Sequence, residues 1–192
     1  MAEGLSQQAR EPRRLWTVGH GAVPLDDLIA LLHAAEIRGV ADVRRFPQSR
    51  RHPHFNRGRL AEALPAAGID YRSMTELGGR RDPDGSDTNA AITDPAFRGY
   101  ADYMQTAQFA VALENLLAVA RERRTAVMCA ESKPEQCHRS LIADALVARG
   151  IAVVHLLHGG ALAEHVPSAR VKVAKGRVTY PDRQGGLWNQ RR

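Results

Sequence analysis

The sequence predicts a single compact α/β domain built on a mostly parallel sheet of about five strands, with helices on both faces. Between residues 15 and 156, apolar runs of strand length alternate with amphipathic stretches of helix length, and this alternation is typical of parallel sheets. The chain has 192 residues, of which 44% are hydrophobic, so it is long enough to bury one core. No apolar run is long enough to cross a bilayer, and we therefore expect no membrane partner.

Three strands and two helices are expected in the first half of the chain. The strands are short segments of extended character, and the first helix carries an apolar stripe at helical spacing. The expected elements are strands at residues 15–18, 40–43 and 69–71 and helices at residues 25–35 and 60–67. The stripe that should face the core consists of Leu28, Ile29, Leu31 and Leu32.

The second half is predicted to add a long helix, two further strands with a helix between them, and a hairpin. Pro at the first helical position and Gly just past the last one are usual helix boundaries. The four residues AKGR between the hairpin strands suit a tight turn. In chain order we expect a helix at residues 95–121, a strand at 125–129, a helix from Pro134 to the residue before Gly150, a strand at 151–156, and hairpin strands at 171–173 and 178–180.

Three segments are expected to lack regular structure. Residues 78–94 (GGRRDPDGSDTNAAITD) are rich in Gly, Pro, Asp and Ser, which predicts a long surface loop of the kind that often serves as a lid. Residues 1–13 and 182–192 are expected to be flexible tails, which leaves residues 14–181 as the single domain. The N-terminal residues are polar and do not resemble a signal peptide, so we expect a cytoplasmic protein.

Polar residues follow the predicted strands at the edge where parallel sheets bind ligands. His20 follows the first strand, Arg44 and Arg45 follow the second, Glu131 follows the fourth, and His158 follows the fifth. Because parallel strands end at the same edge of a sheet, these side chains should converge. The sequence therefore predicts a binding site at the carboxyl edge of the sheet.

The loop at residues 42–60 (DVRRFPQSRRHPHFNRGRL) concentrates positive charge. It contains six arginines, and no acidic residue occurs between Arg44 and Glu62. Such charge becomes favourable when an anion binds, so the expected partner is an anionic small molecule or nucleic acid, in agreement with the net charge of +6. Phe46 and Phe55 could stack on nucleic-acid bases or pack into the core, and both interpretations stay open.

Two cysteines flank the loop after the fourth strand, and they are too few for a secreted disulfide framework. Counting by fours on the predicted helix places Cys137 with Leu141 on the apolar stripe, which favours a packed core thiol. A catalytic thiolate supported by His138 and Arg139 is a second interpretation. Metal binding by Cys129, Cys137 and His138 is a third, although the spacing matches no common zinc pattern.

Five sequence blocks occur in a distinctive order. They are TVGHG at residues 17–21, DVRRFPQSRR with HFN at 42–56, ELGG at 76–79, YADYMQT at 100–106 and MCAESKPEQCHR at 128–139. These blocks resemble the family known as domain of unknown function 488. The resemblance covers about residues 15–160 and implies a compact α/β domain, but no activity, because the family is named for lacking an assigned one. The matching polar positions are His20, Asp42, Arg44, Ser49, Arg50, Tyr103, Cys129, Glu131, Cys137, His138 and Arg139.

Three classes of function follow from these residues. The first is an enzyme for a phosphorylated or nucleotide-like substrate, in which arginines hold the anion and the chemistry falls to Glu131, His138, His20 or Cys137. The second is a nucleic-acid-binding module without catalysis, and the third is a metal or redox protein that uses the two thiols. The residues assigned to ligand binding are Asp42, Arg44, Arg45, Ser49, Arg50, Tyr103 and Arg139.

Overall fold

The computed structural model describes residue 12 and residues 14–182. The strands are β1 (Arg14–Gly19), β2 (Gly39–Asp42), β3 (Asp70–Ser73), β4 (Thr125–Cys129), β5 (Ala152–Leu156), β6 (Leu162–Glu164), β7 (Lys172–Ala174) and β8 (Arg177–Thr179). The helices are α1 (Leu25–Ala34), α2 (Arg57–Ala66), α3 (Pro95–Tyr103), α4 (Ala107–Glu122) and α5 (Arg139–Val147), with 3-10 turns η1 (Pro53–Phe55), η2 (Thr75–Leu77) and η3 (Pro134–Gln136). The predicted tails lie almost entirely outside the described residues.

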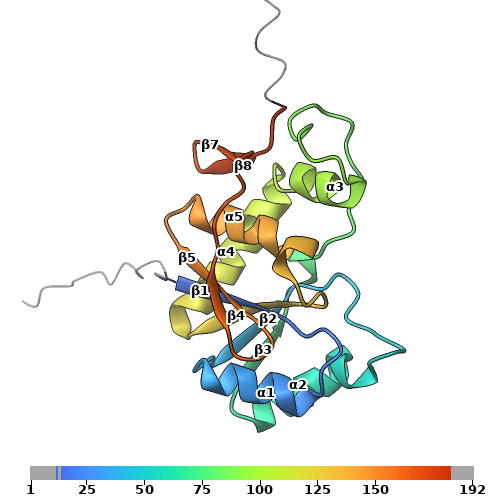
Figure 1. Cartoon of the computed structure of the whole chain (residues 1–192), viewed down its shortest axis with the longest axis vertical. Helices are drawn as coiled ribbons and strands as arrows, with labels where there is room; N and C mark the ends of the chain where they lie inside the picture. The colour runs from blue at the N-terminus through green and yellow to red at the C-terminus, as the bar shows by residue number, and fades with distance from the viewer. Residues whose placement is uncertain (1–11, 13, 183–192) are drawn as a thin grey trace, which may run out of the picture.

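A six-stranded sheet forms the centre of the fold, with helices packed against both of its faces (Figure 1). The strand order is β3-β2-β4-β1-β5-β6. Every neighbouring pair in this sheet is parallel except β5 with β6. The predicted α/β class is therefore confirmed, and β6 adds an edge strand to the five that were expected. Within the described residues, no helix is long and apolar enough to cross a membrane.

Two hydrophobic cores lie on opposite faces of the sheet. Side chains alternate across a strand, so β1 contributes Val18 to one core and Leu15 to the other. Helices α1 and α2 cover the first core, whereas α4 and α5 cover the second (Figure 1). A fully buried leucine such as Leu28 or Leu116 contributes about 1.5–3 kcal/mol relative to an exposed one. These two cores hold the strand ends in fixed positions at the carboxyl edge.

The single helix predicted at residues 95–121 is wrong, because the chain forms two helices there. The first ends at Tyr103 and the second begins at Ala107. Thr106 caps the second helix, since its hydroxyl oxygen accepts a hydrogen bond from the backbone N–H of Phe109 at 3.2 Å. Apolar residues on both sides of Thr106 keep a helical spacing, and this continuity concealed the break.

The helix predicted to begin at Pro134 begins instead at Arg139. Pro134 opens η3, and Cys137 follows it with an extended backbone (φ −137°, ψ 140°). The prediction that Cys137 shares a helical stripe with Leu141 is therefore wrong, although its side chain is buried. The extended backbone between η3 and α5 separates Cys137 from the helix that was expected to carry it.

The predicted C-terminal hairpin is confirmed as β7–β8, and the residue that follows it joins a buried polar network. The Tyr180 hydroxyl donates to Asp144 Oδ2 at 2.6 Å, and His165 Nε2 donates to Asp144 Oδ1 at 2.8 Å. His155 Nε2 is hydrogen-bonded to His165 Nδ1 at 2.9 Å, and the Thr17 hydroxyl is hydrogen-bonded to His155 Nδ1 at 2.6 Å. Every ring nitrogen is then engaged, so this network joins elements of the fold and leaves no free base.

We expect Tyr180→Phe to lower the free energy of unfolding by about 1–3 kcal/mol, because the buried carboxylate of Asp144 loses a hydrogen bond. Urea denaturation measures this loss. Tyr103→Phe is the matched control, since the Tyr103 hydroxyl donates to the Glu76 carbonyl at an exposed site, and it should cost less than about 1 kcal/mol. Equal losses in the two variants would contradict the role of the buried network.

Candidate active site

A pocket of about 380 Å³ lies at the carboxyl edge of the sheet. Its lining includes Arg44 and Arg45 after β2, Cys129 and Glu131 at the end of β4, and His138 before α5. The neighbouring strands β1 and β4 are followed by helices on opposite faces of the sheet. Open α/β sheets bind ligands where the connections diverge in this way, so the pocket occupies the position expected from the sequence.

Arg44 borders the pocket, but its guanidinium is bonded mainly within the protein. Its Nε and Nη2 donate to the two carboxylate oxygens of Asp42 at 2.8 and 2.6 Å, and Nη2 also donates to the Phe55 carbonyl at 2.8 Å. Nη1 lies 3.1 Å from His20 Nε2, and the Tyr71 hydroxyl donates to Asp42 at 2.7 Å. One of the five guanidinium N–H groups is left for a ligand, so Arg44 and Asp42 mainly support the pocket.

His20 is a partner of Arg44 rather than a base in the pocket. Burial and the charge of Arg44 lower the pKa of His20 to about 4, so its ring is neutral at pH 7. Nδ1 then donates to the Gly21 carbonyl at 2.9 Å, and Nε2 accepts from Arg44. The ring stacks on buried Phe55 at 4.0 Å. Both ring nitrogens of His20 therefore have hydrogen-bond partners. Phe55 packs into the core, so its ring is not available to stack on bases.

Arg139 holds the loop after β4 and does not line the pocket. Its side chain is 1% exposed, Nη1 donates to the Glu131 carbonyl, and Nη2 donates to the Ser132 carbonyl at 2.9 Å. Gly19 makes room for this loop, because a Cβ at that position would lie 1.7 Å from the Glu131 carbonyl oxygen. Arg139 therefore positions the backbone that carries Glu131 at the pocket.

Two thiols and an imidazole converge at the floor of the pocket. His138 Nε2 donates to the Val43 carbonyl at 3.1 Å, and Nδ1 lies 3.7 Å from the Sγ atoms of both Cys129 and Cys137. The three ligand-type atoms all lie within 4.8 Å of one another. Gly79 packs against this ring, since a Cβ there would lie 2.8 Å from Nδ1. The arrangement can serve as a Cys–His pair or hold a thiophilic metal ion.

The two thiols do not hold their protons equally. A hydrogen bond from Cys129 lowers the pKa of Cys137 in spite of burial. The same hydrogen bond, together with burial, raises the pKa of Cys129. Cys137 therefore gives up its proton more readily than Cys129, and the thiolate is the form that both a nucleophile and a metal ligand require.

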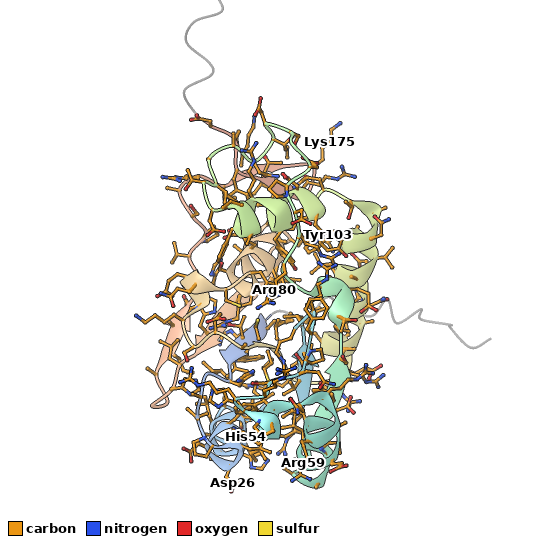
Figure 2. All side chains as sticks on the ribbon, turned by 90° about the vertical axis from the view of Figure 1, so that its right-hand side faces the viewer. Asp26, His54, Arg59, Arg80, Tyr103 and Lys175 are labelled. Atoms are coloured by element: carbon orange, nitrogen blue, oxygen red, sulfur yellow. The ribbon has the colours of Figure 1, made fainter. Side chains whose placement is uncertain are left out.

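The rim of the pocket carries exposed charge. Arg45 Nη1 donates to the Arg80 carbonyl, which ties the loop at residues 78–94 to the segment after β2. Within the described residues, no salt bridge involves either of these arginines. Phe46 is 62% exposed with the Arg45 guanidinium 5.5 Å from its ring centroid, and Glu131 is also exposed at this rim. Figure 2 shows Arg80 at mid-height, between α3 and the layer of α1 and α2.

Besides Asp42 and Arg139, three further residues assigned to ligand binding lie outside the pocket lining. Ser49 shapes its own loop by accepting a hydrogen bond from the backbone of His52 at 2.9 Å. Arg50 is exposed beyond the pocket, and the Tyr103 hydroxyl donates to a backbone carbonyl. Sequence reasoning missed Arg80, for which the signal was a pair of arginines directly after the Gly pair of the ELGG block.

Residues 24–146 match the model of a protein family described as Domain of unknown function DUF488. This range covers most of the chain and includes every residue of the pocket lining. No match was found among curated proteins or among solved structures. The site must therefore be interpreted from its own chemistry.

Acid should destabilise the fold between pH 6.5 and pH 4. An unfolded histidine binds a proton at about pH 6.5, whereas burial lowers the pKa of folded His20 and His155 to about 4. The unfolded chain then binds more protons, so stability is full above pH 6.5. As the pH falls toward 4, each of the two histidines should cost about 1.4 kcal/mol per pH unit. Urea unfolding at a series of pH values measures this slope.

The variant His20→Gln removes the contribution of His20 to the pH dependence of stability, because glutamine does not bind a proton in this range. It should flatten the pH dependence relative to the native chain. His158→Gln is the control, since His158 is exposed and takes no part in the hydrogen bonds of His20 and Arg44. It should leave the slope unchanged. A His20→Gln slope equal to that of the native chain would show that His20 is not held neutral by the fold.

Proposed function

The chain belongs to the family described as Domain of unknown function DUF488, and we propose that it is an enzyme that acts on a small anionic substrate of the phosphate type. The observation that carries the proposal is the composition of one pocket. Exposed guanidiniums of Arg45 and Arg80 share it with the sulfur of Cys137 and the imidazole of His138. Family membership confirms the resemblance of the sequence blocks but assigns no activity.

Arg45 and Arg80 supply the binding part of this function. Their guanidiniums lack a carboxylate partner within the described residues, unlike that of Arg44, which is committed to Asp42. A guanidinium presents two parallel N–H groups that match phosphate or carboxylate oxygens. An anion at the rim would relieve the repulsion between the two arginines, and this gain in free energy favours binding.

The floor of the pocket supplies the reactive groups. The sulfur of Cys137 lies 3.7 Å from His138 Nδ1, and both residues share the pocket lining with Arg45 and Arg80. An anion held by the rim would present its reacting atom to this cluster in a fixed orientation, which is a large part of catalysis. Glu131 lies on the same lining and carries the carboxylate that can accept or return a proton.

A second candidate function is single-stranded nucleic-acid binding, and the exposure of Phe46 favours it. Proteins of this kind combine arginines with exposed aromatic rings on which bases stack. Phe46 has such a ring beside Arg45, and Arg50 and Arg51 are exposed on the same loop. This function predicts that affinity depends on the whole loop and falls steeply with salt.

Thermal unfolding with a panel of anions tests the first proposal. We expect inorganic phosphate or a mononucleotide to raise the Tm, because a ligand at about 100 times its Kd stabilises the folded state by about 2.7 kcal/mol. Arg80→Gln should lose most of this shift. Arg50→Gln is the matched control, since it removes an arginine outside the pocket lining, and it should keep the shift.

The same panel separates the two functions. Stabilisation by a short single-stranded oligonucleotide alone, lost at moderate salt and weakened equally by Arg80→Gln and Arg50→Gln, would favour the nucleic-acid-binding module. Stabilisation by no anion would contradict both. Once a stabilising anion is known, turnover of its esters is the next measurement, and Cys137→Ser should abolish it.

A further inference from the structure

We propose that Cys129, Cys137 and His138 bind a thiophilic divalent metal ion, for which Zn²⁺ is the expected species. The chain has only two cysteines. The fold brings one from the end of β4 and the other from the residue after η3 to the same imidazole. Two thiolates and one histidine, with a fourth position left open, form a known ligand set of catalytic zinc.

The distances among the three ligand atoms fit one metal ion. Zinc bonds of 2.3 Å to sulfur and about 2.05 Å to nitrogen, at a tetrahedral angle, place the two ligand atoms about 3.6 Å apart. His138 Nδ1 lies 3.7 Å from the sulfur of Cys129 and 3.7 Å from that of Cys137. The sulfur atoms, which lie within 4.8 Å of each other, need to reach a separation of about 3.8 Å in the tetrahedral site. Closing the site therefore takes a shift of about 1 Å or less, which a small side-chain rotation provides.

The surroundings of His138 are those of a ligating histidine. A metal-bound histidine usually donates its second ring N–H to a backbone carbonyl or carboxylate, which fixes the ring and the tautomer. His138 Nε2 donates to the carbonyl of Val43 at 3.1 Å. Val43 is itself held to β4, because its N–H donates to the Met128 carbonyl at 2.9 Å. The hydrogen bond to Val43 therefore holds the ring with Nδ1 at the same distance from both sulfur atoms.

Charge balance also favours a metal with thiolate ligands. A bare cation would be repelled by the neighbouring guanidiniums of Arg44 and Arg139. Two thiolates cancel the charge of a divalent ion, and soft sulfur ligands select Zn²⁺ over Mg²⁺ or Ca²⁺. The two protons of the thiols leave when the ion binds. The bound site is then neutral and can lie beneath an arginine rim.

The fourth position of the ion would face the pocket. All three ligands belong to the pocket lining, which also includes Ala130 and Glu131. The ion would supply a Lewis acid at the floor, below the arginines that hold the substrate anion. This inference extends the proposed function by naming its reactive group. Metal binding and anion binding are measured separately, so either can fail without the other.

Metal content and cobalt substitution test the inference. The full chain, purified without chelator, should retain one metal ion per chain by elemental analysis. After removal of that ion, titration with Co²⁺ should reach one equivalent. It should produce the visible absorption of a tetrahedral site and a thiolate-to-cobalt charge-transfer band, and Zn²⁺ should displace both.

Variants assign the signal to these residues. Cys137→Ser should remove the thiolate-to-cobalt band or reduce it by about half, and His138→Ala should weaken Co²⁺ binding by at least about 10-fold. Glu135→Gln is the matched control, because it alters a carboxylate on η3 outside the lining, and it should bind Co²⁺ as the native chain does. Circular dichroism of each variant checks that it is folded.

Two results would overturn the inference. One is a native chain that retains no ion, gives no cobalt bands and has two thiols that react equally fast with an alkylating reagent with and without Zn²⁺. The other is a cobalt spectrum that is the same in Cys137→Ser and His138→Ala as in the native chain, which would place the ion elsewhere. If phosphate raises the Tm of the native chain but either of these results is found, the proposed function stands and the metal site is rejected.

Discussion

The shape of the pocket depends on the buried ion pair between Asp42 and Arg44. Asp42 ends β2 with no exposed surface, and Arg44 folds back over it to bond the Phe55 carbonyl and His20. Removing one partner of a buried pair costs about 3–5 kcal/mol, because the other charge is left uncompensated. The pair is therefore stable only while both partners are present. The Tyr71 hydroxyl donates a further hydrogen bond to the Asp42 carboxylate. One interaction thus joins the segments after β1 and β2 to β3 and η1.

The arginines of this edge have two different uses, and burial separates them. Arg44 and Arg139 are buried, and their N–H groups bond Asp42 and backbone carbonyls of neighbouring loops. Arg45 and Arg80 are exposed on the pocket lining and keep donors available. The buried arginines fix the loops so that the exposed ones can bind an anion with little loss of conformational entropy. Positive charge at this edge of the sheet therefore contributes to stability through the buried arginines and to anion recognition through the exposed ones.

Much of the sheet could be predicted from the sequence, because apolar strands and amphipathic helices have different periods. The break at Thr106 could not, since the apolar spacing continues through it and only the cap reveals it. Cys137 was misplaced for a related reason, because a 3-10 turn and an extended residue precede α5. The sequence placed polar residues at the carboxyl edge, where the structure has a pocket, but it did not distinguish which arginines are bonded within the protein. The charge of an arginine can be read from the sequence, but its partners cannot. Arg139 bonds backbone carbonyls and Arg80 stays exposed because of how the loops fold.

We propose that the rim of the pocket binds an anion above a metal ion held at its floor. Crystals of the full chain grown with Zn²⁺ and inorganic phosphate, measured at the zinc absorption edge, test it most directly. We expect one anomalous peak bonded to Cys129, Cys137 and His138, with phosphate between that peak and the guanidiniums of Arg45 and Arg80. A peak at other residues, or phosphate bound away from this pocket, would contradict it.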